Sequence, residues 1–276
     1  MLRSMKDLEN YAIRATDGNI GHVTDFYFDD EAWVIRYLVV DTGTWLQSRK
    51  VLISPVSIGH PTWTERILPV SITKEQVKNS PDIDTETPVS RQYETRYLGY
   101  YGYPFYWGGD GLWGAGLYPS MMMPGYAGFD SQAVRTEAQK AADRAEQARH
   151  RDDDPHLRSC REVMKYHIHA SDGDIGHVRD LLVDEETWAI RYLIVDTSNW
   201  WLGHQVLIAP QWINDVSWPE GKVSVNLTRQ AVKDAPPYDA TLQLDRDQEM
   251  GIYKHYERPG YWATEVKHEA STRPRA

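Results

Sequence analysis

One sequence pattern occurs twice in this chain of 276 residues, and the separation between its two occurrences is constant. Asp17 recurs as Asp172, and the shift of 155 positions is kept without a slip along each copy. The first-copy residues that find an identical partner include Asp17, Gly18, Ile20, Gly21, His22, Val23, Asp25, Asp29, Glu31, Trp33, Ile35, Arg36, Tyr37, Leu38, Val40, Asp41, Thr42, Trp45, Val51, Leu52, Ile53, Pro55, Ile58, Trp63, Val77, Pro81, Glu94, Tyr101, Pro104, Tyr106 and Trp107. This repeat predicts two equivalent folded units, from about Leu2 to Trp107 and from Leu157 to Trp262.

Each copy has the pattern of a small β structure with turns every 8 to 12 residues. Asp17-Gly18 is a strong hairpin signal, because glycine accepts the positive φ that a tight turn requires. Thr73 is expected to cap a short helix that ends before Pro81. The segments expected to be strands are Tyr11–Ala15, Ile20–Asp29, Val34–Val40, Lys50–Ser54 and Ile67–Ile72. Short strands at this spacing predict a small closed or nearly closed barrel.

The segment between the copies changes composition twice. Residues 99–128 are dense in Gly, Tyr, Trp, Pro and Met and favour an irregular linker. Residues 131–149 are rich in strong helix formers and predict a solvated connecting helix. We therefore expect a first barrel at 1–98, a linker with a helix at 99–156, a second barrel with an aromatic tail at 157–262, and a flexible tail at 263–276.

The order of motifs in each copy resembles a known family. A D-G-x-I-G-x-V-x-D turn, a later Asp, an apolar strand ending in Val-Asp and a V-L-I-x-P strand are similar to the PRC-barrel, over about the first 80 residues of each copy. That domain occurs in the photosynthetic reaction-centre H subunit, in the C-terminal barrel of the ribosome-maturation factor RimM and in many bacterial proteins. The resemblance implies a mainly β fold of two tandem PRC-type barrels, and a compact adaptor without common catalytic residues.

Composition excludes several classes of function. The net charge of −10 disfavours binding to the phosphate backbone of nucleic acids. Cys160 is the only cysteine, which excludes an intramolecular disulfide and favours a cytoplasmic protein. No segment approaches the ~20 apolar residues that span a bilayer, so we expect no integral membrane segment.

Histidine and cysteine offer weak candidates for chemistry. His22 and His177 lie near aspartates, as in metal sites, but His22 and Asp25 face opposite sides of a regular strand. His167 and His169 share a strand face and leave a weak transition-metal site open. Cys160 aligns with Met5, which favours a buried structural thiol over a nucleophile. We therefore expect no catalytic residues, no metal site and no cofactor.

Arg36 and Arg191 lie in the middle of apolar strands, where an unpaired charge is costly. One interpretation is an ion pair with Asp25 or Asp29, and with Asp180 or Asp184 in the second copy. The other is a site for an anionic ligand.

Aromatic residues carry the leading functional hypothesis, because Trp and Tyr dominate interface hot spots. We also expect that the tails 97–107 and 253–262 pack across the two barrels. The candidate interaction surface is Trp45, Trp200, Trp201, Tyr101, Trp107, Tyr256 and Trp262. This pattern favours a non-catalytic adaptor that binds a protein partner or itself. A peripheral factor of a membrane electron-transfer complex, and a small-ligand or metal binder using the inter-barrel cleft, are the alternatives.

Overall fold

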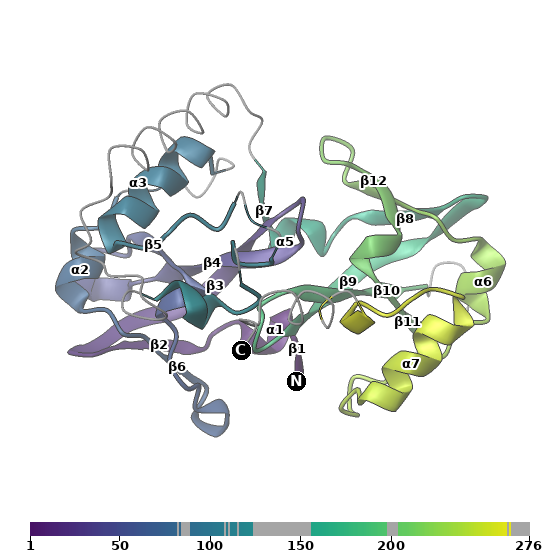
Figure 1. Cartoon of the computed structure of the whole chain (residues 1–276), viewed down its shortest axis with the longest axis horizontal. Coiled ribbons are helices and arrows are strands. Elements are labelled where there is room, and N and C mark those ends of the chain that lie inside the picture. The colour runs from purple at the N-terminus through teal and green to yellow at the C-terminus, as the bar shows by residue number, and fades with distance from the viewer. Residues whose placement is uncertain are drawn as a thin grey trace, which may run out of the picture. The chain divides into compact units, whose positions relative to one another are not determined.

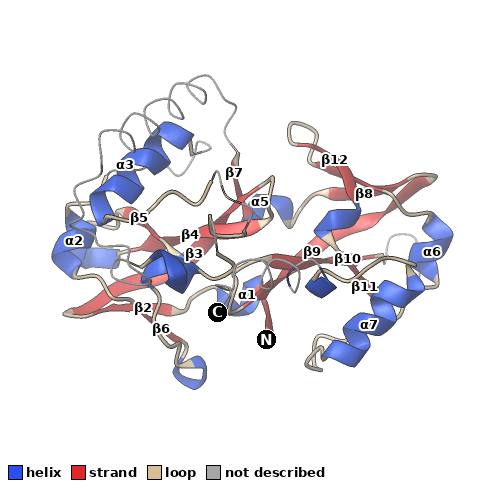
Figure 2. Ribbon diagram, in the orientation of Figure 1, coloured by secondary structure: helices blue, strands red, loops and turns tan. Residues whose placement is uncertain are grey.

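The computed structural model describes residues 1–81, 83, 89–107, 109, 111–114, 116–123, 156–197, 204–263 and 265. Within them the chain forms two compact units, each built on one sheet (Figures 1 and 2). Unit 1 contains residues 1–6, 161–185 and 190–276, and unit 2 contains residues 7–160 and 186–189. The expected connecting helix at 131–149 lies outside the described residues.

The sheet of unit 2 has the strand order β5-β4-β3-β2-β6, and β7 pairs with the second half of β3. Its elements are β2 (Ala12–Ala15), β3 (Gly18–Asp29), β4 (Val34–Asp41), β5 (Lys50–Ile53), β6 (Ile67–Pro69), α2 (Lys74–Lys78), α3 (Arg91–Tyr101) and β7 (Leu157–Ser159). The predicted central strand is confirmed as β4, which is buried along almost its whole length.

The sheet of unit 1 repeats this arrangement in the order β11-β10-β9-β8-β13-β12, and β1 pairs with β9. The elements are β1 (Leu2–Ser4), β8 (His167–Ala170), β9 (Gly173–Asp184), β10 (Ile190–Asp196), β11 (Gln205–Ile208), β12 (Ile213–Ser217), β13 (Lys222–Val225), α6 (Arg229–Lys233) and α7 (Arg246–His255). The short helices α1 (Met5–Leu8) and α5 (Cys160–Val163) follow β1 and β7. Most equivalent elements begin at positions separated by the repeat shift, although β4 and β10 begin 156 positions apart. The structure therefore contains a second sheet with the same order of elements as the first.

Local signals in the sequence explain the turn and the helix start of each copy. Gly18 opens β3 with a φ of 138°, in the hairpin that Asp17-Gly18 predicts. Gly21 allows the closest approach of β3 to β4, because a Cβ there would lie 1.9 Å from the carbonyl oxygen of Asp41. Thr73 caps α2 by accepting from the Gln76 N–H, and the Gln76 side chain accepts from the Thr73 N–H.

The expected barrels are not closed by strand pairing among the described residues: β5 and β6 stand at the two ends of the sheet in unit 2. A side chain replaces the missing strand at β5. The Tyr97 hydroxyl, from α3, donates to the Leu52 carbonyl at 3.0 Å and accepts from the Ser54 N–H at 3.1 Å. The Tyr97 hydroxyl thus binds two backbone groups at this edge of the sheet, where a further strand would otherwise pair.

The helices α3 and α7 correct the sequence-based expectation of one short helix per copy. The expected linker begins at Gly99, but the helix α3 extends to Tyr101. Ser90 caps α3, and Asp245 at the equivalent position caps α7. The ring of Tyr97 packs against Tyr37 of β4 at 5.0 Å, so the start of the aromatic tail belongs to the core of its own unit.

The first strand of each copy belongs to the sheet of the other copy. In unit 1, β1 pairs antiparallel with β9, and in unit 2, β7 pairs in the same register with β3. Both strands have the sequence Leu-Arg-Ser. The repeat boundaries expected from the sequence therefore differ from the boundaries of the compact units.

The last aspartate of the D-G-x-I-G-x-V-x-D motif anchors the exchanged strand. Asp25 accepts a hydrogen bond from the Ser159 hydroxyl at 2.6 Å, and Asp180 accepts one from Ser4 at 2.5 Å. A second contact is also repeated, because Arg158 binds Asp30 and Arg3 binds Glu185. The exchange therefore has the same polar contacts in both units.

Candidate functional site

A buried arginine marks the centre of each unit. Arg36 of β4 is almost fully buried, and its Nη2 lies 3.2 Å from Asp29 Oδ2. The guanidinium carbon lies 3.8 Å from the ring centroid of Tyr106, and its Nη1 donates to the Leu112 carbonyl oxygen at 2.7 Å. The prediction of an ion pair with Asp29 is confirmed. The alternative interpretation was a site for an anionic ligand. Protein groups take that place, since a carboxylate, a carbonyl and an aromatic face already contact Arg36.

A buried glutamate joins this arginine cluster to α3. Glu94 has no solvent exposure. Its Oε1 accepts from the hydroxyls of Tyr37 at 3.2 Å and Tyr106 at 2.5 Å. Its Oε2 lies 3.3 Å from Arg91 Nη1 and 3.0 Å from His156 Nε2. Glu94 therefore connects the central strand, the helix, the aromatic tail and the residue that precedes the exchanged strand β7.

Unit 1 contains the same constellation at the repeat shift. Arg191 pairs with Asp184 at 3.2 Å and lies 4.0 Å from the ring centroid of Tyr261. Glu249 accepts from the hydroxyls of Tyr192 at 2.9 Å and Tyr261 at 3.0 Å. The residues of the two clusters are Asp29, Arg36, Tyr37, Arg91, Glu94, Tyr106 and Trp107, and Asp184, Arg191, Tyr192, Arg246, Glu249, Tyr261 and Trp262. Their repetition indicates a structural role common to both units.

Each cluster has one further polar contact, and the first-copy counterpart of Glu265, Asp110, lies outside the described residues. In unit 1, Glu265 Oε1 lies 2.5 Å from Arg191 Nη2 and gives this arginine a second carboxylate partner. Burial alone would lower the pKa of Arg191, but Glu265 and Asp184 raise it above its usual value. In unit 2, His156 binds Glu94, and the equivalent place in unit 1 is held by Met1, whose carbonyl accepts from the Glu185 N–H.

The ion pair of Asp29 with Arg36 in unit 2 should make the free energy of unfolding depend on pH. Burial alone would raise the pKa of Asp29, but Arg36 and the N–H groups of Ala32 and Glu31 outweigh it and hold that pKa below 3.8. A carboxyl group whose pKa is lowered by folding stabilises the folded state at pH values above its pKa in the unfolded chain. This stabilisation is lost as the pH falls through the pKa of the folded state. We expect Asp29→Asn to lower the free energy of unfolding by about 3 kcal/mol at neutral pH.

Urea unfolding at several pH values would test this dependence. The difference in unfolding free energy between the wild type and Asp29→Asn should shrink as the pH falls below 3.8. The exposed Asp215→Asn serves as the control and should change stability by less than about 0.5 kcal/mol. A difference that stays constant down to acidic pH would contradict the assignment.

The candidate interaction residues do not lie on one uniform surface. Tyr101, Trp107 and Trp262 are half-buried, and Tyr256 is buried. Trp107 and Trp262 lie under the guanidinium groups of Arg91 and Arg246, at 4.2 and 4.5 Å. Trp200 and Trp201 lie outside the described residues.

Two aromatic side chains flank α2 with part of their surface in solvent. Trp45 is half-buried, its Nε1 donates to the Ile20 carbonyl, and Lys74 Nζ lies 4.5 Å from its ring centroid. Tyr100 is 42% exposed, and its hydroxyl donates to the Gln76 carbonyl at 2.9 Å. We call Trp45, Lys74, Gln76 and Tyr100 the α2 surface.

The histidine and cysteine candidates take ordinary positions. His169 Nδ1 lies 2.6 Å from Asp174 Oδ1 on the surface, and His167 is exposed. Cys160 is buried. No group of three or more potential metal ligands occurs among the residues that the structure describes.

The family comparison agrees with the geometry of the first copy. Residues 3–76 match the model of the PRC-barrel domain. The chain carries a PRC-barrel domain. The match begins with the exchanged strand β1 and ends within α2, so α3 and the aromatic tail lie beyond the matched PRC-barrel segment. The structure adds a second sheet with the same order of elements as this domain. No curated protein matches the chain.

The buried glutamates are the cluster residues that sequence reasoning did not assign. Glu94 and Glu249 recur at the repeat shift together with Tyr106 and Tyr261, which was the available signal. Their role was missed because the helix that presents them was not predicted. Within the described ranges, no helix is both long and apolar enough to cross a bilayer.

Proposed function

We propose that this protein is a non-catalytic, cytoplasmic adaptor that binds a protein partner or a second copy of itself. The α2 surface is the observation that supports this proposal. It combines an exposed tyrosine, a half-buried tryptophan and a lysine on unit 2. Aromatic groups of this kind contribute large contact areas at low cost in conformational entropy.

The duplicated clusters favour an adaptor over an enzyme. Arg36 and Arg191 each contact a carboxylate and the face of a tyrosine. Glu94 and Glu249 each accept from two tyrosine hydroxyls and an arginine. Groups held by one another in a buried network support a rigid scaffold rather than a site that exchanges protons with a substrate.

Affinity purification from native cells tests the proposal. The bait is the full-length protein, compared with the double variant Trp45→Ala/Tyr100→Ala, and light scattering measures self-association of both. We expect the wild type to capture a stoichiometric partner or to form a dimer. The double variant should bind that partner, or dimerise, at least about tenfold more weakly. Trp218→Ala provides a matched control, since Trp218 is a half-buried tryptophan of the other unit. A wild-type protein that is strictly monomeric and captures nothing would contradict the proposal.

A further inference from the structure

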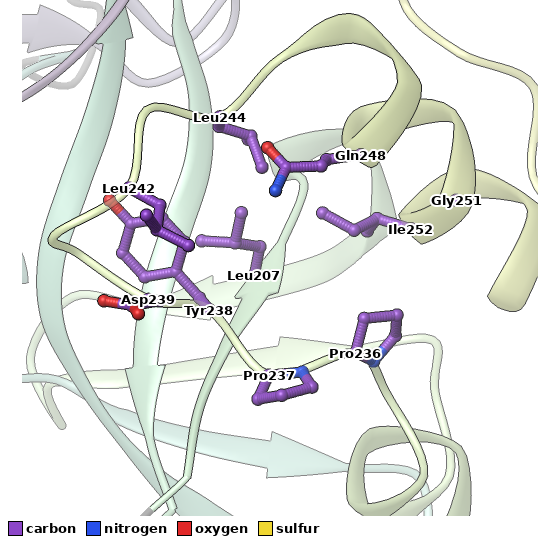
Figure 3. Close-up of a pocket in the computed structure, with 10 residues that line it drawn as sticks. All are labelled: Leu207, Pro236, Pro237, Tyr238, Asp239, Leu242, Leu244, Gln248, Gly251 and Ile252. Atoms are coloured by element: carbon purple, nitrogen blue, oxygen red, sulfur yellow. The ribbon is translucent and has the colours of Figure 1, made fainter.

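Unit 1 contains an apolar pocket between β11, the segment that follows α6, and α7 (Figure 3). Its volume is about 260 Å³. For comparison, a dry cavity of about 150 Å³ accommodates benzene. The lining residues are Leu207, Pro236, Pro237, Tyr238, Asp239, Leu242, Leu244, Gln248, Gly251 and Ile252. The side chains of Leu207, Leu242 and Ile252 converge on its centre (Figure 3).

The first copy shows which side chain takes the equivalent position on its helix. Gln248 corresponds to Tyr93, which is buried, and Pro236 corresponds to Pro81. The hydroxyl of Tyr93 donates to the Pro81 carbonyl oxygen at 2.9 Å. A phenol group of the chain itself therefore extends from the helix to this proline in the first copy.

Two more substitutions leave the position open in the second copy. Arg96 lies over the ring of Tyr93 at 5.9 Å in the first copy, and its counterpart is Gly251. A Cβ at Gly251 would meet no atom within 4 Å, so this side of the pocket is open. The counterpart of Tyr97 is Ile252, which is a smaller side chain.

A neighbouring tyrosine of α7 replaces one contact of Tyr97, the contact with the central strand. Tyr253, one position further along α7, contacts Tyr192 at 6.2 Å, as Tyr97 contacts Tyr37 at 5.0 Å. The aromatic contact with the central strand is thus kept. The helix position of Tyr93 is taken by Gln248, and the tyrosine that lines the pocket, Tyr238, comes from the segment after α6.

The chemistry of the lining favours an apolar ligand and disfavours an anion. Leucine, isoleucine and proline side chains form most of the wall. Asp239 is the ionisable carboxylate among the lining residues, and hydrogen bonds from Thr241 lower its pKa, so it is charged at neutral pH and repels anions. Leu242 at the pocket is 58% exposed, which leaves apolar surface for a ligand to cover.

We propose that this pocket binds a small neutral phenol. Its ring lies against Leu207 and Ile252, and its hydroxyl donates to the carbonyl oxygen of Pro236, as Tyr93 does to Pro81 in the first copy. The ligand thus supplies the group that the second copy lacks. This site goes beyond the adaptor function, because it lies on unit 1 and takes a small molecule.

Titration of the full-length protein with 4-methylphenol tests the site, with toluene as the probe that lacks the hydroxyl. Methyl NMR resonances of Leu207 and Ile252 should shift with 4-methylphenol, and toluene should bind at least about tenfold more weakly. Gln248→Tyr restores the first-copy residue and should weaken 4-methylphenol binding at least about tenfold. Equal binding of toluene, or no shift at Leu207 and Ile252, would overturn the proposal.

Two further variants separate a filled pocket from a misfolded unit. Gly251→Arg restores the first-copy residue at an open position, and it should also weaken binding of 4-methylphenol at least about tenfold. Met250→Tyr adds a phenol to the same helix at a position that is 46% exposed and does not line the pocket, so binding should stay unchanged. Gln248→Tyr and Gly251→Arg proteins that melt like the wild type and bind 4-methylphenol as tightly would contradict the assignment.

Discussion

Replacement of Glu94 by alanine is expected to lower the free energy of unfolding by about 3 to 5 kcal/mol. The carboxylate is fully buried and holds two tyrosine hydroxyls, Arg91 and His156. Its removal leaves these donors without an acceptor in a buried environment, which costs more than the loss of one hydrogen bond. A loss of this size is a large share of the ~10 kcal/mol that stabilises a typical domain.

The second copy supplies a matched control for this experiment. Glu249→Ala removes the equivalent carboxylate, but its arginine partner Arg246 is half exposed, and the place of His156 is held by Met1. We therefore expect a smaller loss for Glu249→Ala than for Glu94→Ala, and almost none for the exposed Glu65→Ala. Urea unfolding followed by tryptophan fluorescence measures all three. Equal, small losses for Glu94→Ala and Glu65→Ala would show that the glutamate does not hold the cluster together.

The features that were predicted correctly depend on residues close together in sequence or on the repeat itself. The hairpin at Gly18 and the capped start of α2 follow from local turn and cap chemistry. An ion pair of Arg36 with Asp25 or Asp29 followed from the cost of an unpaired charge in an apolar strand, and the structure shows Asp29 as the partner. Each of these features needs only a few neighbouring residues or one pair of adjacent strands.

The helix α3 was missed because its sequence is dominated by tyrosine and contains Gly99, both poor helix formers. Its stability comes instead from tertiary contacts, such as Tyr97 against Tyr37 and Glu94 between two tyrosine hydroxyls. The pocket was missed for a related reason. The alignment of Tyr93 with Gln248 was visible in the repeat, but whether a neighbouring side chain fills the space requires coordinates.

The exchange of β1 and β7 could not be read from the sequence, because both strands are Leu-Arg-Ser. Each segment would satisfy the same partners in its own copy or in the other, since Asp25 and Asp180 are equivalent acceptors. Local chemistry therefore does not distinguish pairing of β1 or β7 with its own copy from pairing with the other copy. An identical strand exchanged between equivalent units is the intramolecular form of domain swapping.

The exchanged pairing predicts which cysteine pairs can form a disulfide, because Arg3 lies opposite Val183 and Arg158 lies opposite Phe28. Directly opposed residues of an antiparallel pair have Cβ atoms ~5 Å apart, close to the reach of a disulfide. A background of Cys160→Met, which introduces the residue of the first copy, removes the native thiol. Four double variants then combine Arg3→Cys or Arg158→Cys with Val183→Cys or Phe28→Cys.

The most direct test of strand exchange between two equivalent folded copies is disulfide formation in these four full-length variants. Non-reducing gels and mass spectrometry measure it. Cross-links within one chain are expected for Arg3 with Val183 and for Arg158 with Phe28, at near-complete yield under mild oxidation. The pairs within one copy, Arg3 with Phe28 and Arg158 with Val183, should remain reduced. Efficient cross-linking of those two pairs would show that each copy keeps its own first strand.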